Sequence, residues 1–288
     1  MAGRQRLKPG ALLGVPTRGT TNPNRLRRVD RWLTGDPQIG ALLRRTDDPL
    51  VVDLGYGASP VTTVEMARRL RAGHPDIRVL GLELDAERVT AAQGATEPPW
   101  LDFRRGGFEL AGTRPVLVRA FNVLRQYAEH EVAGAWQVML DRLAPGGLLV
   151  EGTCDEIGRL CSWVTVAADG PRTLTLSCKV SAFERPSTVA QRLPKTLIHR
   201  NVPGERIHHF LSTLDDCWAT AASHQPFGAR ARWVAAVRML ADRGWPLLGR
   251  RKRWRLGEVT VPWVSVAPAS SGHVHLGSPA ASPGGDLE

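Results

Sequence analysis

Val51-Val-Asp-Leu-Gly55-Tyr-Gly57-Ala-Ser-Pro60 is the stretch of sequence that decides the fold class of this 288-residue chain. Its apolar first half has the character of a buried strand, and the glycines that follow form a tight turn before a helical pattern over residues 62–72. Gly55 and Gly57 carry no Cβ, so a ligand can approach the backbone closely there. The start of the next helix presents N–H groups to a polar or anionic group. The stretch therefore predicts a strand, a ligand-binding turn and a helix.

The surrounding sequence repeats this alternation of strand and helix. Apolar runs predict strands at residues 50–54, 77–84, around 101–103, 116–121, 148–151, 163–168 and 173–180. Helical spacing of apolar residues marks 25–33, 62–72 and 132–143, and later 207–218 and 233–240. Because Asp169-Gly-Pro171 is a short connection, the last two strands should form an antiparallel hairpin. We expect an α/β fold with a doubly wound, mostly parallel seven-stranded sheet whose last strand is antiparallel. Residues 258–266 could add a late strand.

The same pattern suggests four regions along the chain. Residues 1–46 form a basic helical segment, and residues 47–185 form the ligand-binding α/β domain. Residues 186–266 read as a mainly helical cap over the site, and residues 267–288 as a disordered tail rich in Ser, Gly, Pro and Ala. The tail has too little apolar surface to offset the entropy lost on ordering.

The end of the second strand supplies an acid beside the glycine turn. In an open α/β sheet, ligands bind at the carboxyl ends of the strands, which places Glu83 next to Gly55 and Gly57. A carboxylate there can accept two hydrogen bonds from a ribose diol. A dinucleotide site would have a third glycine where Pro60 stands, so a nicotinamide-dependent oxidoreductase is disfavoured.

Taken together, the ordered motifs resemble the class I S-adenosylmethionine-dependent methyltransferases, which have a Rossmann-like fold. The resemblance covers about residues 47–180 and rests on Asp53-Leu-Gly-Tyr-Gly57, Gly81-Leu-Glu83-Leu-Asp85, Phe103-Arg-Arg-Gly-Gly107-Phe108, Leu143-Ala-Pro-Gly-Gly147-Leu-Leu-Val150 and the closing hairpin. Two positions depart from the family pattern. The third motif glycine is Ser59, and Gly107 stands where the adenine loop often has an acid, so we expect backbone groups alone to recognise the adenine ring.

The resemblance implies S-adenosyl-L-methionine as cofactor and no metal. It implies a binding set of Asp53, Gly55, Tyr56, Gly57, Glu83, Leu84, Gly107 and Phe108. Asp53 would organise the loop around the methionine moiety, and Glu83 would hold the ribose. A methyltransferase-like fold that only binds nucleic acid or a protein partner stays open as the alternative, because fold does not fix function.

Methyl transfer requires that the acceptor be aligned, desolvated and sometimes deprotonated. Asn122 and Arg119, at the end of the fourth strand, and Tyr127, shortly after it, are the catalytic candidates, although a loop-capping asparagine, a surface arginine and a chance tyrosine would look the same. Glu151, at the end of the fifth strand, could orient an amine acceptor. The sequence does not identify the acceptor, its reacting atom or the oligomeric state.

The net charge of +10 lies at the flanks of the chain. Residues 1–50 carry ten basic and four acidic side chains, and residues 228–255 carry nine and one. Such flanks could bind RNA or another polyanion. Arginines make up 34 of the 38 basic residues, so compositional bias is the explanation that we favour over a polyanionic partner. We favour a small-molecule or lipid-like acceptor.

The four cysteines have no disulfide or zinc spacing, which favours reduced thiols and a cytoplasmic protein. No apolar run reaches the roughly 18 residues of a membrane helix.

Overall fold

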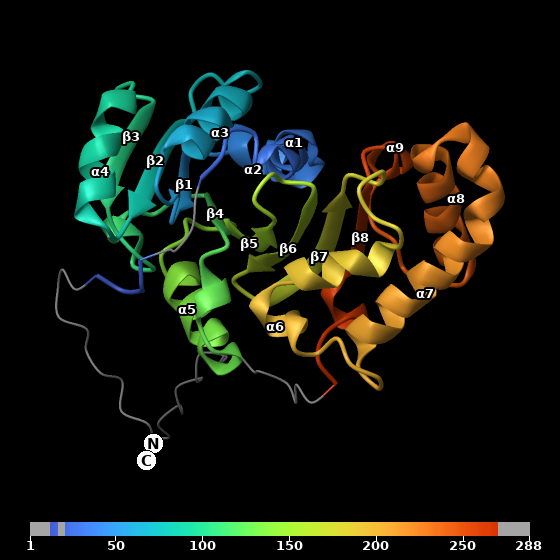
Figure 1. Ribbon diagram of the computed structural model, residues 1–288. Helices are drawn as coiled ribbons and strands as arrows, with labels where there is room; N and C mark the ends of the chain where they lie inside the picture. Colours follow the sequence, from blue (N-terminus) through green and yellow to red (C-terminus); the bar gives the residue numbers. More distant parts are fainter. Residues whose placement is uncertain (1–11, 17–20, 270–288) are drawn as a thin grey trace, which may run out of the picture.

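The computed structural model describes residues 12–16 and 21–269. These residues form one eight-stranded sheet in the order β3-β2-β1-β4-β5-β6-β7-β8 (Figure 1). The strands are β1 Leu50–Leu54, β2 Arg78–Glu83, β3 Leu101–Arg105, β4 Leu117–Phe121, β5 Leu148–Cys154, β6 Leu160–Ala167, β7 Gly170–Cys178 and β8 Glu258–Pro262. Strands β1 to β5 pair in parallel, and β5 to β8 pair antiparallel. The doubly wound, mostly parallel α/β sheet is confirmed.

The sheet has one strand more than the seven predicted. Residues 258–262, a possible late strand in the sequence, pair with β7, so Leu174 faces Val261 and Leu176 faces Val259 across the two strands. Val259 and Val261 are buried, whereas Glu258 and Thr260 point to the other face. This period-two alternation is the pattern of a strand that packs one face on a core.

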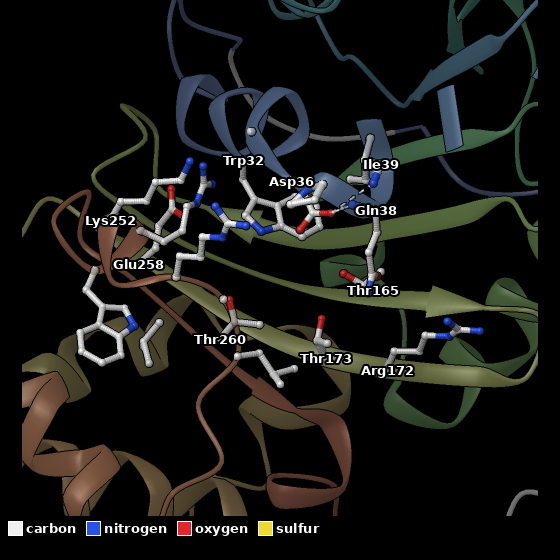
Figure 2. Close-up of a pocket in the computed structure, with 18 of the residues that line it drawn as sticks. Trp32, Asp36, Gln38, Ile39, Thr165, Arg172, Thr173, Lys252, Glu258 and Thr260 are labelled. Carbon is white, nitrogen blue, oxygen red and sulfur yellow. Dashed lines mark hydrogen bonds and ion pairs between the residues drawn. The ribbon is translucent and has the colours of Figure 1, made fainter. Parts of the chain in front are cut away.

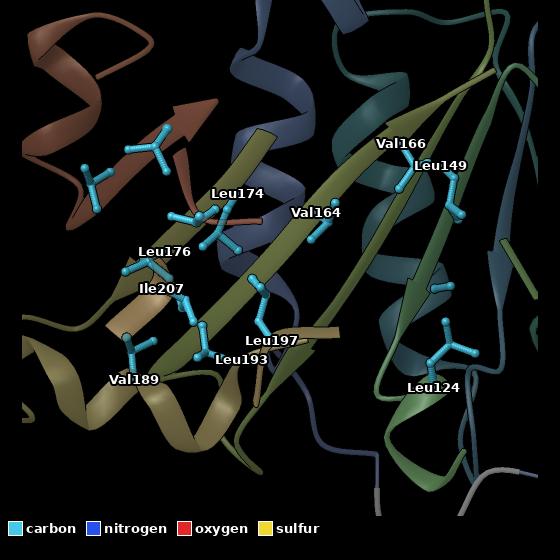
Figure 3. Packing of buried hydrophobic residues seen from close by; sticks show 14 of the residues in the cluster. Leu124, Leu149, Val164, Val166, Leu174, Leu176, Val189, Leu193, Leu197 and Ile207 are labelled. Carbon is cyan, nitrogen blue, oxygen red and sulfur yellow. The ribbon is translucent and has the colours of Figure 1, made fainter. Parts of the chain in front are cut away.

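Helices cover both faces of the sheet. Their bounds are α1 Arg27–Gly35, α2 Pro37–Arg44, α3 Val61–Arg71, α4 Ala86–Ala92, α5 Val132–Leu140, α6 Lys195–Ile198, α7 Arg206–Thr220, α8 Ala229–Asp242 and α9 Arg251–Trp254. One buried cluster joins the sheet to α1, α2 and α3. A second joins the opposite face to α5, α6, α7 and α8, and Figure 3 shows part of this cluster, with Leu149, Val164 and Leu174 on the strands and Leu197 on a segment that packs against them.

The C-terminal helices lie away from the glycine turn. Helices α7 and α8 pack on each other and beside β7 and β8, at the opposite end of the sheet from β2 and β3 (Figure 1). Within the described part of the C-terminal region, residues 186–192, just before α6, border the ends of β4 and β5, where Arg125 donates to the carbonyl of Gln191 and Thr153 to that of Arg192. The predicted cap over the site is thus limited to this short segment. The greater part of the predicted tail, residues 270–288, lies outside the described residues.

No helix in the described part of the chain is long and apolar enough to cross a membrane.

Candidate functional site

The glycine turn lies where the strand order changes direction. Strand β1 is flanked by β2 on one side and β4 on the other, and such a switch point opens a crevice at the carboxyl ends of the strands. Gly55 and Gly57 have φ angles of 69° and 84°, which side chains with a Cβ rarely adopt. The Glu83 carboxylate is buried and accepts the N–H of Gly57 at 2.9 Å and that of Leu84 at 2.8 Å. Glu83 therefore ties the end of β2 to the glycine turn.

Asp53, the residue two positions before Gly55, connects strand β1 to the following helix and to β4. Its side chain is 2% exposed and accepts hydrogen bonds from the Thr63 hydroxyl at 2.6 Å and from Arg119 Nε at 2.9 Å. Arg119 Nη2 also donates to the carbonyl of Thr62, at the start of α3. These bonds fix the strand, the turn and the following helix as one unit. This arrangement is consistent with the loop-organising role expected of Asp53.

Arg119 does not face a ligand. Its guanidinium is fully buried between Asp53 and Asp30 of α1, and Asp30 also pairs with Arg69 of α3. Burial alone would lower the pKa of Arg119, but the two carboxylates raise it above its ordinary value. Burial raises the pKa of Asp30, against the attraction of Arg119. We therefore assign Arg119 a structural role in place of the predicted catalytic one.

The adenine side of the predicted site is covered by the chain's own residues 12–16, here called the N-terminal strap. The carbonyl of Leu13 accepts the N–H of Phe108 at 2.9 Å, and the N–H of Leu13 donates to Glu109 at 2.9 Å. A Cβ on Gly107 would lie 1.9 Å from the Leu13 carbonyl oxygen. Gly107 is thus the residue that permits this close approach. The strap therefore accepts the N–H of Phe108, a backbone group of the predicted adenine loop.

The far end of the strap is held by Tyr127. Its hydroxyl accepts the N–H of Val15 at 2.5 Å, and Gln126 Nε2 donates to the Val15 carbonyl at 2.8 Å. The ring of Tyr127 packs on Phe108 with centroids 5.4 Å apart. A hollow of only about 10 Å³ remains between the strap and the residues Leu54, Gly55, Glu83, Leu84, Gly106, Gly107, Phe108, Val123 and Tyr127. Most of the predicted binding set therefore converges here, against the strap.

The side chain of Tyr56, another residue of the predicted cofactor-binding set, points away from this hollow. Its ring meets Phe103 edge-on at 5.3 Å in the cluster beneath α3, and its hydroxyl lies 3.4 Å from the Arg88 carbonyl. Only its own carbonyl, which accepts the Thr21 hydroxyl at 2.9 Å, is turned to the N-terminal segment. A side-chain contact with the cofactor is therefore not supported for Tyr56.

Asn122 braces the ends of two strands. It has a positive φ of 60°, its N–H donates to the Gly152 carbonyl, and its amide pairs in both directions with Cys154. This geometry matches a loop-capping asparagine more closely than a group presented to an acceptor.

Glu151 has the most unusual environment near the site. It is fully buried, and neither carboxylate oxygen has a hydrogen-bond partner among the described residues. Burial raises the pKa of Glu151 to about 8. Strand pairing places Leu54, Ala120 and Glu151 in one row across β1, β4 and β5, so their side chains share a face. The sequence indicated its position, but its protonation state depends on tertiary burial.

The geometry supports one structural conclusion. The glycine turn, its acid and the adenine loop meet at the carboxyl edge of a doubly wound sheet. The chain has a doubly wound, Rossmann-like fold.

No protein-family model and no curated protein matches the chain. Solved structures do match in part. Human N-acetylserotonin methyltransferase in complex with SAM is 20% identical over 44% of this chain and 36% of that chain, with a TM-score of 0.30. Magnesium protoporphyrin IX methyltransferase from Synechocystis PCC 6803 with bound SAH is 20% identical over 44% and 53%, with a TM-score of 0.34. The CcbJ methyltransferase from Streptomyces caelestis is 17% identical over 54% and 66%, with a TM-score of 0.32. The chain spans less than two thirds of each, and such partial likenesses carry no argument about activity.

Several arginines of the basic flanks bind other parts of the protein, so fewer of their donors are available to a polyanion. Arg28 Nε and Nη1 donate to the carbonyls of Gly158 and Leu256, and Arg253 pairs with the buried Glu258 at 2.7 Å. Arg251 and Arg255 remain exposed along an open groove on α8. The described residues hold no group of three or more His, Cys, Asp or Glu that could bind a metal ion.

Proposed function

We propose that this chain is a class I S-adenosylmethionine-dependent methyltransferase. The observation that carries the proposal is the hydrogen bond from Gly57 to the Glu83 carboxylate, which brings the glycine turn and the acid into one buried site at the switch point of the sheet. The Glu83 carboxylate also accepts the N–H of Asp85 at 3.5 Å and pairs with Arg88 at 3.6 Å, so it fixes the end of β2 as well as the glycine turn.

The lining of the site fits an adenosine group once the strap has moved. Gly107 leaves a cradle that a Cβ would fill, and the Phe108 N–H is a backbone donor suited to an adenine ring nitrogen. Glu83 would hold the ribose hydroxyls. The bound cofactor would supply an activated methyl group. The protein's part is to align the acceptor and to exclude water from it.

Glu151 is the proposed acid–base group on the acceptor side. A carboxyl group with a pKa near the working pH can take up or release a proton, and burial brings the pKa of Glu151 to about 8. Glu151 lies midway along β5, in the same row as Leu54, which lines the hollow. We favour a small-molecule acceptor, because a buried proton acceptor suits an enclosed substrate.

Calorimetry on the full chain tests the proposal. S-adenosylmethionine or S-adenosylhomocysteine should bind, and NAD should not. The variant Glu83→Gln should weaken that binding by about 1.5–3 kcal/mol, the range for hydrogen bonds to a charged group. Glu87→Gln, the same change on the exposed side of α4, is the matched control and should bind normally. Tight NAD binding with both methyl-cofactor forms silent would overturn the proposal.

A second candidate, a non-catalytic methyltransferase-like binding protein, is favoured by one observation. The strap closes the adenine side to about 10 Å³. If the strap never leaves, the cofactor cannot enter on that side.

A further inference from the structure

A second cavity lies far from the glycine turn. It has a volume of about 530 Å³, within the range of small-molecule sites, and is bounded by the end of α1, the start of α2, residues 248–254 and strands β6 to β8 (Figure 2). It reaches Leu148, the first residue of the parallel strand β5, so it lies at the opposite end of that strand from the candidate active site. It also lies on the α1–α2 face, whereas the strap hollow involves residues of the other face.

The floor of this cavity is unusually polar for a covered sheet face. On β7 and β8, apolar residues face α7, and the alternate positions facing α1 and α2 carry hydroxyl or carboxyl groups. Thr165 and Thr173 face each other across β6 and β7, and Thr260 lies on the next strand, opposite Thr175; Figure 2 shows the three threonines on the sheet below Trp32. Thr165 is 7% exposed, and its hydroxyl has no hydrogen-bond partner among the described residues. A buried hydroxyl without a partner is costly, unless a ligand or water supplies one.

Further donors lie at one end of the cavity. Arg253 is fixed by Glu258 at 2.7 Å and by the Arg31 carbonyl at 3.4 Å. Gly35 makes room for it, since a Cβ there would lie 2.5 Å from Arg253 Nη1. In the described residues, Arg253 Nη2 and Trp254 Nε1 have no partner. A preorganised guanidinium and an indole N–H are thus left to bind an acceptor.

The charge around the cavity favours an anion. The carboxylate of Asp36 caps α2, and that of Glu258 is paired with Arg253. Arg250 and Lys252 also line the cavity, are exposed, and form no ion pair within the described ranges. Two cations are therefore uncommitted, whereas both lining acids are engaged.

We propose that this cavity binds a phosphate monoester with a hydroxyl-bearing body, such as a sugar phosphate or a nucleotide. The phosphate would meet Arg250, Lys252 and Arg253, because a dianion matches their charge and their many donors. The sugar hydroxyls would meet Thr165 and Thr173 on the sheet. The proposal does not depend on the methyltransferase assignment, because the two sites share no residue.

Calorimetry with defined probes tests this site. Ribose 5-phosphate, UMP, inorganic phosphate and uridine are titrated separately into the full chain without methyl cofactor. At least one ester should bind with one site per chain, and uridine should not bind. Comparing ribose 5-phosphate with UMP separates a sugar phosphate from a nucleotide. Inorganic phosphate that binds as tightly as the better ester would overturn the proposal, because the hydroxyl floor would then contribute nothing.

Two matched pairs of variants locate the binding. Arg250→Gln with Lys252→Gln should weaken the ester by about tenfold or more, whereas Arg230→Gln with Arg238→Gln, the same charge change in the neighbouring groove, should change it little. Thr165→Val should weaken the ester about two- to tenfold without lowering the urea midpoint, because its hydroxyl has no partner to lose.

Ser177→Ala removes another buried hydroxyl without a partner, outside the cavity, and should leave binding unchanged. Equal losses from both double variants would indicate general attraction of anions. A single-stranded oligonucleotide that binds while both esters stay silent would point to a polyanion on the basic surface. Either result would overturn the proposal.

Discussion

At the scale of single residues, the burial of Glu151 should make the stability of the protein depend on pH. Its carboxyl group ionises near 4.5 when exposed, but burial raises the pKa to about 8. The folded protein therefore keeps this proton at a pH where the unfolded chain has released it. Because the unfolded state then binds fewer protons, stability falls as the pH rises between about 4.5 and 8.

The variant Glu151→Gln should remove this pH dependence. A glutamine has nearly the same shape and no ionisation, so the free energy of unfolding of the variant relative to the native chain should increase by about 2.5 kcal/mol from pH 5.5 to pH 7.5, slightly less than about 1.4 kcal/mol per unit because Glu151 begins to ionise in the fold near pH 8. Urea unfolding followed by circular dichroism at both values measures it. Glu87→Gln is the exposed control and should run parallel to the native chain. Parallel curves for Glu151→Gln would mean that the carboxylate is charged in the fold.

Residue chemistry was predictable where spacing determines it and not where distant contacts do. Gly55, Gly57 and Glu83 meet as expected, because the carboxyl ends of parallel strands share one edge. The position of Arg119 on strand β4 was predicted in the same way. Its role, however, depends on the bond to Asp30, which lies 89 positions away in sequence. No local pattern signals such a pair.

At the scale of elements, the strands were the more predictable part. Strand β1 begins and ends as predicted, and the other predicted strands fall within a few residues of their positions. Helices α2 and α4 were not predicted, because they are only eight and seven residues long and show too few turns of apolar spacing. The strap was not predicted either, since the hydrogen bonds that hold it involve its own backbone N–H and C=O groups, which leave no mark in residue type.

The strap should compete with the cofactor. Its bonds from Phe108 to Leu13 and from Val15 to Tyr127 must break before an adenine group can reach the loop. A site that is open for only a fraction of the time binds its ligand more weakly by that fraction. Removal of residues 1–16 should therefore tighten S-adenosylhomocysteine binding by about tenfold, as measured by calorimetry.

A smaller change tests the same element. Tyr127→Phe removes the acceptor for the Val15 N–H and should also tighten binding, by about two- to tenfold. A chain that binds less tightly after truncation would show that the strap belongs to the cofactor site. If full-length and truncated chains both fail to bind, the non-catalytic candidate is favoured.

At the scale of the whole molecule, the C-terminal region is part of the same sheet. Strand β8 pairs with β7 along five residues, and α7 and α8 bury the apolar face of β6 and β7. A cut at the predicted boundary between residues 185 and 186 would therefore separate β7 from its neighbour β8. It would also remove α7 and α8 from the apolar residues that they cover.

A chain that ends at residue 185 should consequently not fold as an independent domain. It would expose the edge of β7, with its unpaired N–H and C=O groups, and the apolar side chains of Val164, Leu174 and Leu176, and we expect it to aggregate. A chain that ends at residue 269 keeps β8 and the helices and serves as the control, which should unfold in one transition. Size-exclusion chromatography and thermal unfolding by circular dichroism compare the two. A monomeric 1–185 fragment with a sharp transition and intact cofactor binding would contradict this expectation, because residues 186–266 would then be a separable cap.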